Sequence, residues 1–131
     1  LDGDTIRTDM TIFLPQNIYY RNRAIQKGFT LDGKYIDIEI KFVRSGLVTE
    51  KKRNKIIDDF DKLSNIINRG FVPNHGETLY GLSIIGFQKF KTLRSFLNDP
   101  IFQAAMNAFT SHDKKIILLC CENIQYPNPT T

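Results

Sequence analysis

Residues 35–42 read Tyr-Ile-Asp-Ile-Glu-Ile-Lys-Phe and alternate polar with apolar side chains. This alternation has the period of a half-buried β-strand, in which neighbouring side chains point to opposite faces. One face would carry Ile36, Ile38, Ile40 and Phe42, and the other Asp37, Glu39 and Lys41. A carboxylate two residues before a lysine could hold a divalent cation beside an ammonium group that meets a phosphate. These residue types therefore indicate metal-assisted phosphodiester cleavage.

Other elements must position this strand. We expect an earlier strand over residues 6–14, ended by Pro15, and a long connection over 16–34 that closes on the turn signal Asp32-Gly33. A helix from about Glu50 to Asn68 follows, with Thr49 as its N-cap and an apolar stripe at helical spacing. The later elements are a central strand over 79–90, a helix from Thr92 that is broken near Pro100, and a buried strand over 115–122. This order predicts one α/β domain, residues 1–125, with helices on both faces of a mixed central β-sheet, followed by a tail, 126–131.

Composition narrows the class of protein. The chain has 131 residues, 41% of them hydrophobic, and a net charge of +4, which is compatible with a nucleic-acid partner. No apolar run approaches the roughly 18 residues of a membrane helix, so no membrane partner is expected. Cys120 and Cys121 are adjacent, which disfavours a disulfide between them and predicts buried thiols in a reducing, cytoplasmic compartment. The first residue, Leu1, suggests a fragment or processed form of a larger parent protein.

Arg7-Thr8-Asp9-Met10 places an aspartate on the first expected strand, and Glu39-Ile40-Lys41 forms an acid-X-lysine motif on the second. In these residues the chain resembles the PD-(D/E)XK nuclease superfamily, which includes restriction endonucleases and Holliday-junction resolvases and has an aspartate on its first hairpin strand and an acid-X-lysine motif on the second. The order of elements after Lys41 matches as well. The resemblance implies a restriction-endonuclease-like fold, a Mg²⁺ cofactor for which Mn²⁺ substitutes, and DNA rather than RNA as substrate. The implied catalytic residues are Asp9, Glu39 and Lys41.

Three departures from the family pattern are visible. Thr8 stands where the family usually has proline, and the family's first helix has no counterpart here, so we expect it upstream. The segment between Asp9 and Glu39 is long, which a hairpin insertion at 16–34 would accommodate.

The physical chemistry of such a site can be stated from the donor atoms. Mg²⁺ prefers oxygen ligands and keeps several waters, so Asp9, Glu39, the backbone carbonyl of Ile40 and phosphate oxygens would suffice. The two carboxylates can meet only if their strands pair with both side chains on one face. Lys41 would then stabilise charge or position the attacking water. Carboxylates within about 5 Å of each other would fit a shared ion, whereas opposite faces would exclude one.

Two groups of cations are candidates for binding nucleic acid, and each has a plainer explanation. Lys51, Lys52 and Lys55 crowd the first turns of a helix, where the dipole disfavours them unless a phosphate is near, or they form a solvated face. The 16–34 segment carries Arg21, Arg23 and Lys27 among aromatic residues that could stack on bases or pack on the sheet.

Alternatives to a nuclease stay open. Asp37, Glu39 and Lys41 could be the wet face of a strand with cross-strand charge pairing. The domain would then be a non-catalytic nucleic-acid-binding or protein-interaction module, or a binding protein of the toxin-immunity type. Cleavage of two strands would favour a homodimer.

Overall fold

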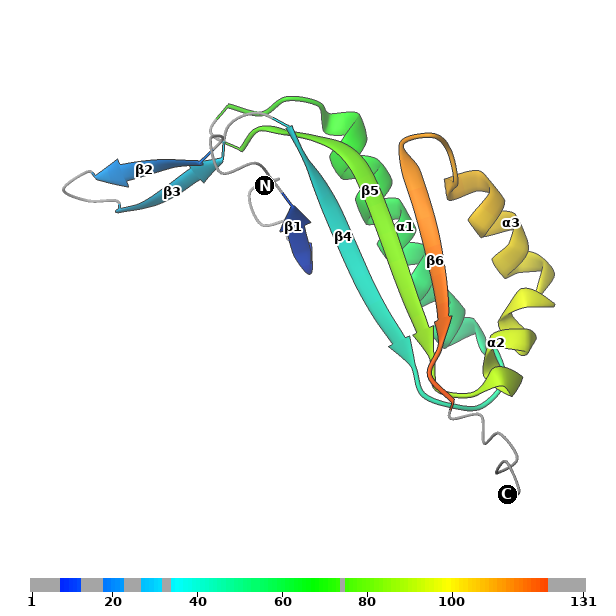
Figure 1. The fold of residues 1–131 in the computed structure, drawn as a ribbon. Coiled ribbons are helices and arrows are strands. Elements are labelled where there is room, and N and C mark those ends of the chain that lie inside the picture. Colours follow the sequence, from blue (N-terminus) through cyan, green and yellow to red (C-terminus); the bar gives the residue numbers. More distant parts are fainter. Residues whose placement is uncertain (1–7, 13–17, 23–26, 32–33, 74, 123–131) are drawn as a thin grey trace, which may run out of the picture.

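The computed structural model describes residues 8–12, 18–22, 27–31, 34–73 and 75–122 (Figure 1). The strands are β1 (Met10–Ile12), β2 (Ile18–Asn22), β3 (Lys27–Leu31), β4 (Lys34–Val43), β5 (Glu77–Phe87) and β6 (Lys114–Cys120). The helices are α1 (Glu50–Arg69), α2 (Phe90–Leu97) and α3 (Pro100–Phe109). A mixed α/β fold is therefore confirmed, and the chain order of the predicted elements is kept.

The main sheet has the order β1-β4-β5-β6. β1 runs antiparallel to β4, whereas β4, β5 and β6 are parallel to one another. β5 is central, as predicted. β2 and β3 form a separate antiparallel pair that extends away from the main sheet in Figure 1, so the connection after β1 contains the expected hairpin insertion. The predicted turn at Asp32-Gly33 and the tail at 126–131 lie outside the described residues.

The helix boundaries follow from local chemistry. Thr49 caps α1 by accepting the Lys52 N–H, and Gly70 ends it with a φ of 70°, a left-handed conformation that glycine adopts without strain. Asp99 caps α3 by accepting the Phe102 N–H, and Pro100 occupies the first helical turn, where its missing N–H costs no hydrogen bond. The predicted break between the second and third helices is thus confirmed.

The three helices cover one face of the sheet, so the prediction of helices on both faces was wrong. One aromatic core joins them: Phe60 of α1 contacts both Phe102 and Phe109 of α3, and Phe96 of α2 packs between Phe102 and Phe87 of β5. The strand order β4-β5-β6 advances in one direction. Crossovers of one hand therefore place α1, α2 and α3 on the same side.

The exposure of β4 also differs from that of a strand with one apolar, buried face, although Ile38 on the apolar face is 4% exposed. Its alternation is real, but the face that packs against α1 carries Asp37 and Glu39, which are 4% and 3% exposed. Ile40 and Phe42 lie on the open face and are 46% and 53% exposed. A wet polar face is therefore excluded for the two acids.

The open face continues across the other strands. Its exposed apolar side chains are Met10, Ile12, Ile40, Phe42, Tyr80, Ile117 and Leu119. β6 alternates between half-buried and exposed positions, so the prediction of a buried strand there was wrong. Cys121 is exposed and Cys120 half-buried, and both are free thiols, so the prediction of two buried thiols was wrong as well.

Substitutions on the helix-covered face and on the open face of the sheet should have different effects on the free energy of unfolding. Replacing the fully buried Leu63 with alanine is expected to lower the free energy of unfolding by about 3 kcal/mol or more, because it leaves a cavity under α1. Ile117→Thr on the open face keeps a β-branched side chain and should change it by less than about 1 kcal/mol. Urea unfolding of both variants measures the difference. Equal losses would mean that the open face is covered in solution.

Candidate active site

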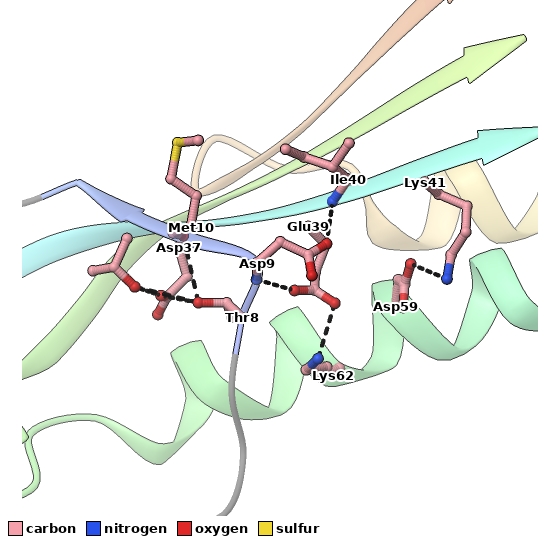
Figure 2. Close-up of polar contacts among 10 residues, drawn as sticks. Thr8, Asp9, Met10, Asp37, Glu39, Ile40, Lys41, Asp59 and Lys62 are labelled. Atoms are coloured by element: carbon pink, nitrogen blue, oxygen red, sulfur yellow. Dashed lines mark hydrogen bonds and ion pairs between the residues drawn. The ribbon is translucent and has the colours of Figure 1, made fainter.

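The pairing of β1 with β4 brings together the two acids of the motif. Met10 is paired with Ile38, so Asp9, the residue before β1, lies opposite Glu39. The Asp9 backbone N–H donates to Glu39 Oε2 at 2.9 Å, and the Ile40 N–H donates to Asp9 Oδ2 at 2.7 Å. Figure 2 shows the two carboxylates next to each other at this edge of β4. The expectation that they share one side of the sheet therefore agrees with the geometry.

The backbone of Ile40 faces the same edge. In an extended strand the N–H and C=O of one residue point to the same side. Because the Ile40 N–H reaches Asp9, its carbonyl oxygen is also directed toward the edge where the two acids meet. A third oxygen donor is thus placed beside the carboxylates.

Helix α1 adds two charged residues that sequence reasoning missed. Lys62 Nζ lies 2.9 Å from Glu39 Oε1, and Lys41 Nζ lies 3.4 Å from Asp59 Oδ2 (Figure 2). Asp59 and Lys62 are three residues apart and therefore neighbours on one flank of the helix. A signal for them was present: both directly precede members of the apolar stripe, Phe60 and Leu63, in a helix that follows β4 and packs on it.

Asp37 connects β4 to its neighbouring strands through hydrogen bonds of its carboxylate. The alternative of a wet strand face would leave it solvated, but it is buried. Its two oxygens accept hydrogen bonds from the hydroxyl groups of Thr8 and Thr11 at 2.6 Å and of Thr78 at 2.5 Å. The expectation of a solvated residue was wrong. Thr8, where the family pattern has proline, is one of the donors that fasten β1 to β4.

Burial and neighbouring charges change the pKa of the Asp59 carboxyl group. Burial raises the pKa of this carboxyl above its usual value, and the nearby Glu39 carboxylate raises it further. Lys41 and Lys62 oppose the rise but do not cancel it. Burial likewise raises the pKa of Tyr35, which lies beside the Asp37 carboxylate. Asp59 and Glu39 are therefore close enough for their charges to interact between β4 and α1.

The raised pKa of Asp59 has a measurable consequence. Between the ordinary pKa of aspartate and the raised value, the folded state binds more protons than the unfolded state. The contribution of Asp59 to the free energy of unfolding therefore falls as pH rises through this window. We expect Asp59→Asn to remove that fall. Unfolding in urea at a series of pH values around 4, compared between the two proteins, measures it. Parallel pH profiles would contradict the prediction.

The cations predicted to bind nucleic acid differ in exposure and in whether the structure describes them. Lys51 and Lys55 are exposed on α1, and Lys55 precedes Asp59 by one turn, about 6 Å along the axis. The ammonium group of Lys52 donates to the Ser45 carbonyl at 2.5 Å. Arg23 lies outside the described residues. Arg21 and Lys27 are in β2 and β3, but their side chains are outside the described part.

The donor set for a metal is small. Among the described residues, no three His, Cys, Asp or Glu side chains are grouped as metal ligands. The site instead offers the carboxylates of Asp9 and Glu39 and a backbone carbonyl.

No helix in the described part of the chain is long and apolar enough to cross a membrane.

No protein-family model, curated protein or solved structure matches this chain. Its function is therefore inferred from the geometry and chemistry of the site.

Proposed function

We propose that this chain is the core of a metal-dependent endonuclease with the restriction-endonuclease-like fold, and that it hydrolyses phosphodiester bonds in DNA. One observation carries the proposal: the register of β1 on β4 sets Asp9 beside Glu39, with Lys41 one strand repeat farther along the same face. These are the residues that the resemblance to PD-(D/E)XK nucleases singles out.

The donor chemistry fits a magnesium ion. Mg²⁺ is commonly held by one or two carboxylates together with waters and substrate phosphates, so Asp9, Glu39 and the Ile40 carbonyl meet its needs. Mn²⁺ accepts the same oxygen ligands. When bound, such an ion polarises the phosphate and lowers the pKa of a coordinated water.

The residues of the chain have separable roles. Asp9 and Glu39 supply negative charge and oxygen donors at the edge of β4. Lys41 lies on the same face and provides a positive charge for the phosphate oxygens or the attacking water. Its present partner, Asp59, is a carboxylate on α1, so Lys41 must exchange this ion pair for the substrate. Lys51 and Lys55 are exposed along α1, where they suit contact with the flanking backbone of the nucleic acid.

The charge balance of the site supports this assignment. Asp9, Glu39 and Asp59 carry one more negative charge than Lys41 and Lys62 neutralise. The buried Asp37 carboxylate beside them adds a further negative charge. A divalent cation would neutralise this excess and remove the repulsion of a phosphodiester. We further propose that the protein is intracellular and that it acts as a homodimer or as part of a larger parent protein.

A non-catalytic module on the same fold is the second candidate. It is favoured by the pairing of Lys41 with Asp59 and of Lys62 with Glu39, because these pairs stabilise the residues without a ligand. Such a protein would bind nucleic acid or another protein but would not cleave.

The test is incubation of the purified chain with supercoiled plasmid DNA, and separately with RNA, in Mg²⁺, Mn²⁺ or EDTA. We expect nicking or linearisation that requires the metal and is lost in Glu39→Gln. Lys115→Ala, which removes a charge from the open face, is the matched control and should cleave normally. RNA cleavage alone would overturn the choice of substrate. Binding without cleavage in either metal would favour the non-catalytic module.

A further inference from the structure

Lys62 occupies the position next to Glu39 that a metal ion would need. Its ammonium group lies 2.9 Å from Oε1, while the Asp9 N–H occupies Oε2. The Glu39 side chain is only 4% exposed, whereas that of Lys62 is 33% exposed. Glu39 is thus held as a buried carboxylate by a cation that keeps access to solvent.

A buried carboxylate needs either several hydrogen-bond donors or a positive partner, because removing its charge from water is costly unless the charge is compensated. Asp37 has three hydroxyl donors, whereas Glu39 has one backbone N–H and the ammonium group of Lys62. Lys62 supplies that compensation from α1 on a long, flexible side chain. A divalent cation bound by Asp9 and Glu39 would supply it instead. An ammonium group and a divalent cation that contact one carboxylate repel each other, so full occupancy by both is unfavourable.

We propose that Lys62 is a displaceable counter-cation, which neutralises Glu39 in the metal-free protein and leaves it when a divalent cation binds. The inference rests on the proposed function, since it assumes the metal site of Asp9 and Glu39. Lys62 is a positioning residue in this scheme: it sets the metal affinity of the site and keeps β4 and α1 together before the metal arrives.

An acceptor for the displaced ammonium group lies on the same helix. Asp59 precedes Lys62 by three residues, which is the spacing of neighbouring side chains on a helix surface. Asp59 now holds Lys41 at 3.4 Å. Transfer of Lys62 to Asp59 weakens that hold and releases Lys41 toward a phosphate. Metal binding and the availability of Lys41 are coupled in this way.

The experiment measures Mn²⁺ binding to the whole chain, without nucleic acid, by isothermal titration calorimetry. Lys62→Met keeps an unbranched side chain, one atom shorter, but removes its charge. This variant should bind Mn²⁺ about tenfold more tightly than the unmodified protein, equivalent to about 1.4 kcal/mol. Lys62→Arg keeps the competing charge and should remain within about threefold. Lys115→Met on the open face is the matched control for the loss of one positive charge, and should remain within about twofold.

A second readout needs no substitution. In the unmodified protein labelled at lysine, the side-chain NMR signal of Lys62 should shift on addition of Mg²⁺, and that of Lys115 should not. This measurement keeps the inference testable if Lys62→Met fails to fold.

The outcomes separate the two proposals. Equal or weaker Mn²⁺ binding by folded Lys62→Met, or an unchanged Lys62 signal at saturating metal, would overturn the displacement and leave the metal site standing. Absence of saturable binding in every protein, Glu39→Gln included, would overturn the metal site and the inference together.

Discussion

Replacing Lys41 with alanine is expected to reduce the rate of the DNA cleavage that we propose for this chain by about a hundredfold or more, because removal of one positioned charge from a site of this kind costs that much. The residue is half-buried on the face of β4 that carries Glu39, and its ammonium group is held by Asp59 on α1. The charge is therefore held beside the site before substrate binds, and it reaches a phosphate when this ion pair is exchanged. Single-turnover cleavage of plasmid DNA in saturating Mg²⁺ measures the loss.

Binding separates this role from a simple contribution to affinity. The Kd for DNA in Ca²⁺, which supports binding through oxygen ligands, should change by less than about threefold in Lys41→Ala. Circular dichroism checks that the fold is retained after Asp59 loses its partner. A Lys41→Ala protein that cleaves at the normal rate would remove Lys41 from the catalytic residues, and a parallel loss of binding would make it a phosphate contact only.

The second large effect concerns Asp37, whose replacement by alanine should lower the free energy of unfolding by about 2–4 kcal/mol. Three hydroxyl groups donate to its two oxygens, and the buried Thr78 loses its acceptor when the carboxylate is removed. Thr8 and Thr11 flank Asp9 and Met10, so the same change loosens β1 from β4. Urea unfolding measures the loss of stability.

Cleavage should fall in the same variant, because Asp9 depends on β1 for its position beside Glu39. Hydrogen exchange at the amides of Thr11 and Ile12 reports the loosening directly. Asp61→Ala is the matched control, since Asp61 is an exposed acid on α1, and its stability should change by less than about 0.5 kcal/mol. A stable Asp37→Ala protein with unchanged exchange in β1 would contradict this account.

The losses of stability and of cleavage expected for Asp37→Ala share a structural cause. β1 has three residues, too few to be held by its ladder alone, yet it carries one of the two acids of the candidate site. Additional hydrogen bonds attach it to β4. Thr11 donates to Asp37, and Asp9 both donates to Glu39 and accepts from Ile40. The fold and the candidate site therefore depend on the same buried carboxylates.

The helices and strands could be predicted because the residues that specify them are close together in the sequence. Strict alternation placed Asp37, Glu39 and Lys41 on one face of β4. Thr49, Gly70 and the Asp99–Pro100 pair marked the ends of helices, since caps and proline act within one turn. The pairing of Asp9 with Glu39 was expected from the resemblance to PD-(D/E)XK nucleases, with a hairpin insertion to accommodate the long segment between them.

The side of the sheet that is covered was decided by tertiary structure alone. Alternation records that two faces differ, but it does not say which one α1 will cover. Apolar residues usually mark the buried face, and here Ile40 and Phe42 are exposed while Glu39 is buried. The reversal is possible because Thr8, Thr11, Thr78 and Lys62 satisfy the two acids, and none of these partners is close in sequence to β4.

The sequence by itself therefore determined the order of elements, the parity of the motif and most helix ends. Tertiary structure decided the contribution of α1, in which Asp59 and Lys62 complete the ion pairs with Lys41 and Glu39. The physical reason is that caps and periodicity depend on neighbours in the chain. The compensation of a buried charge depends instead on whichever groups the packing of strand and helix brings within a few ångströms.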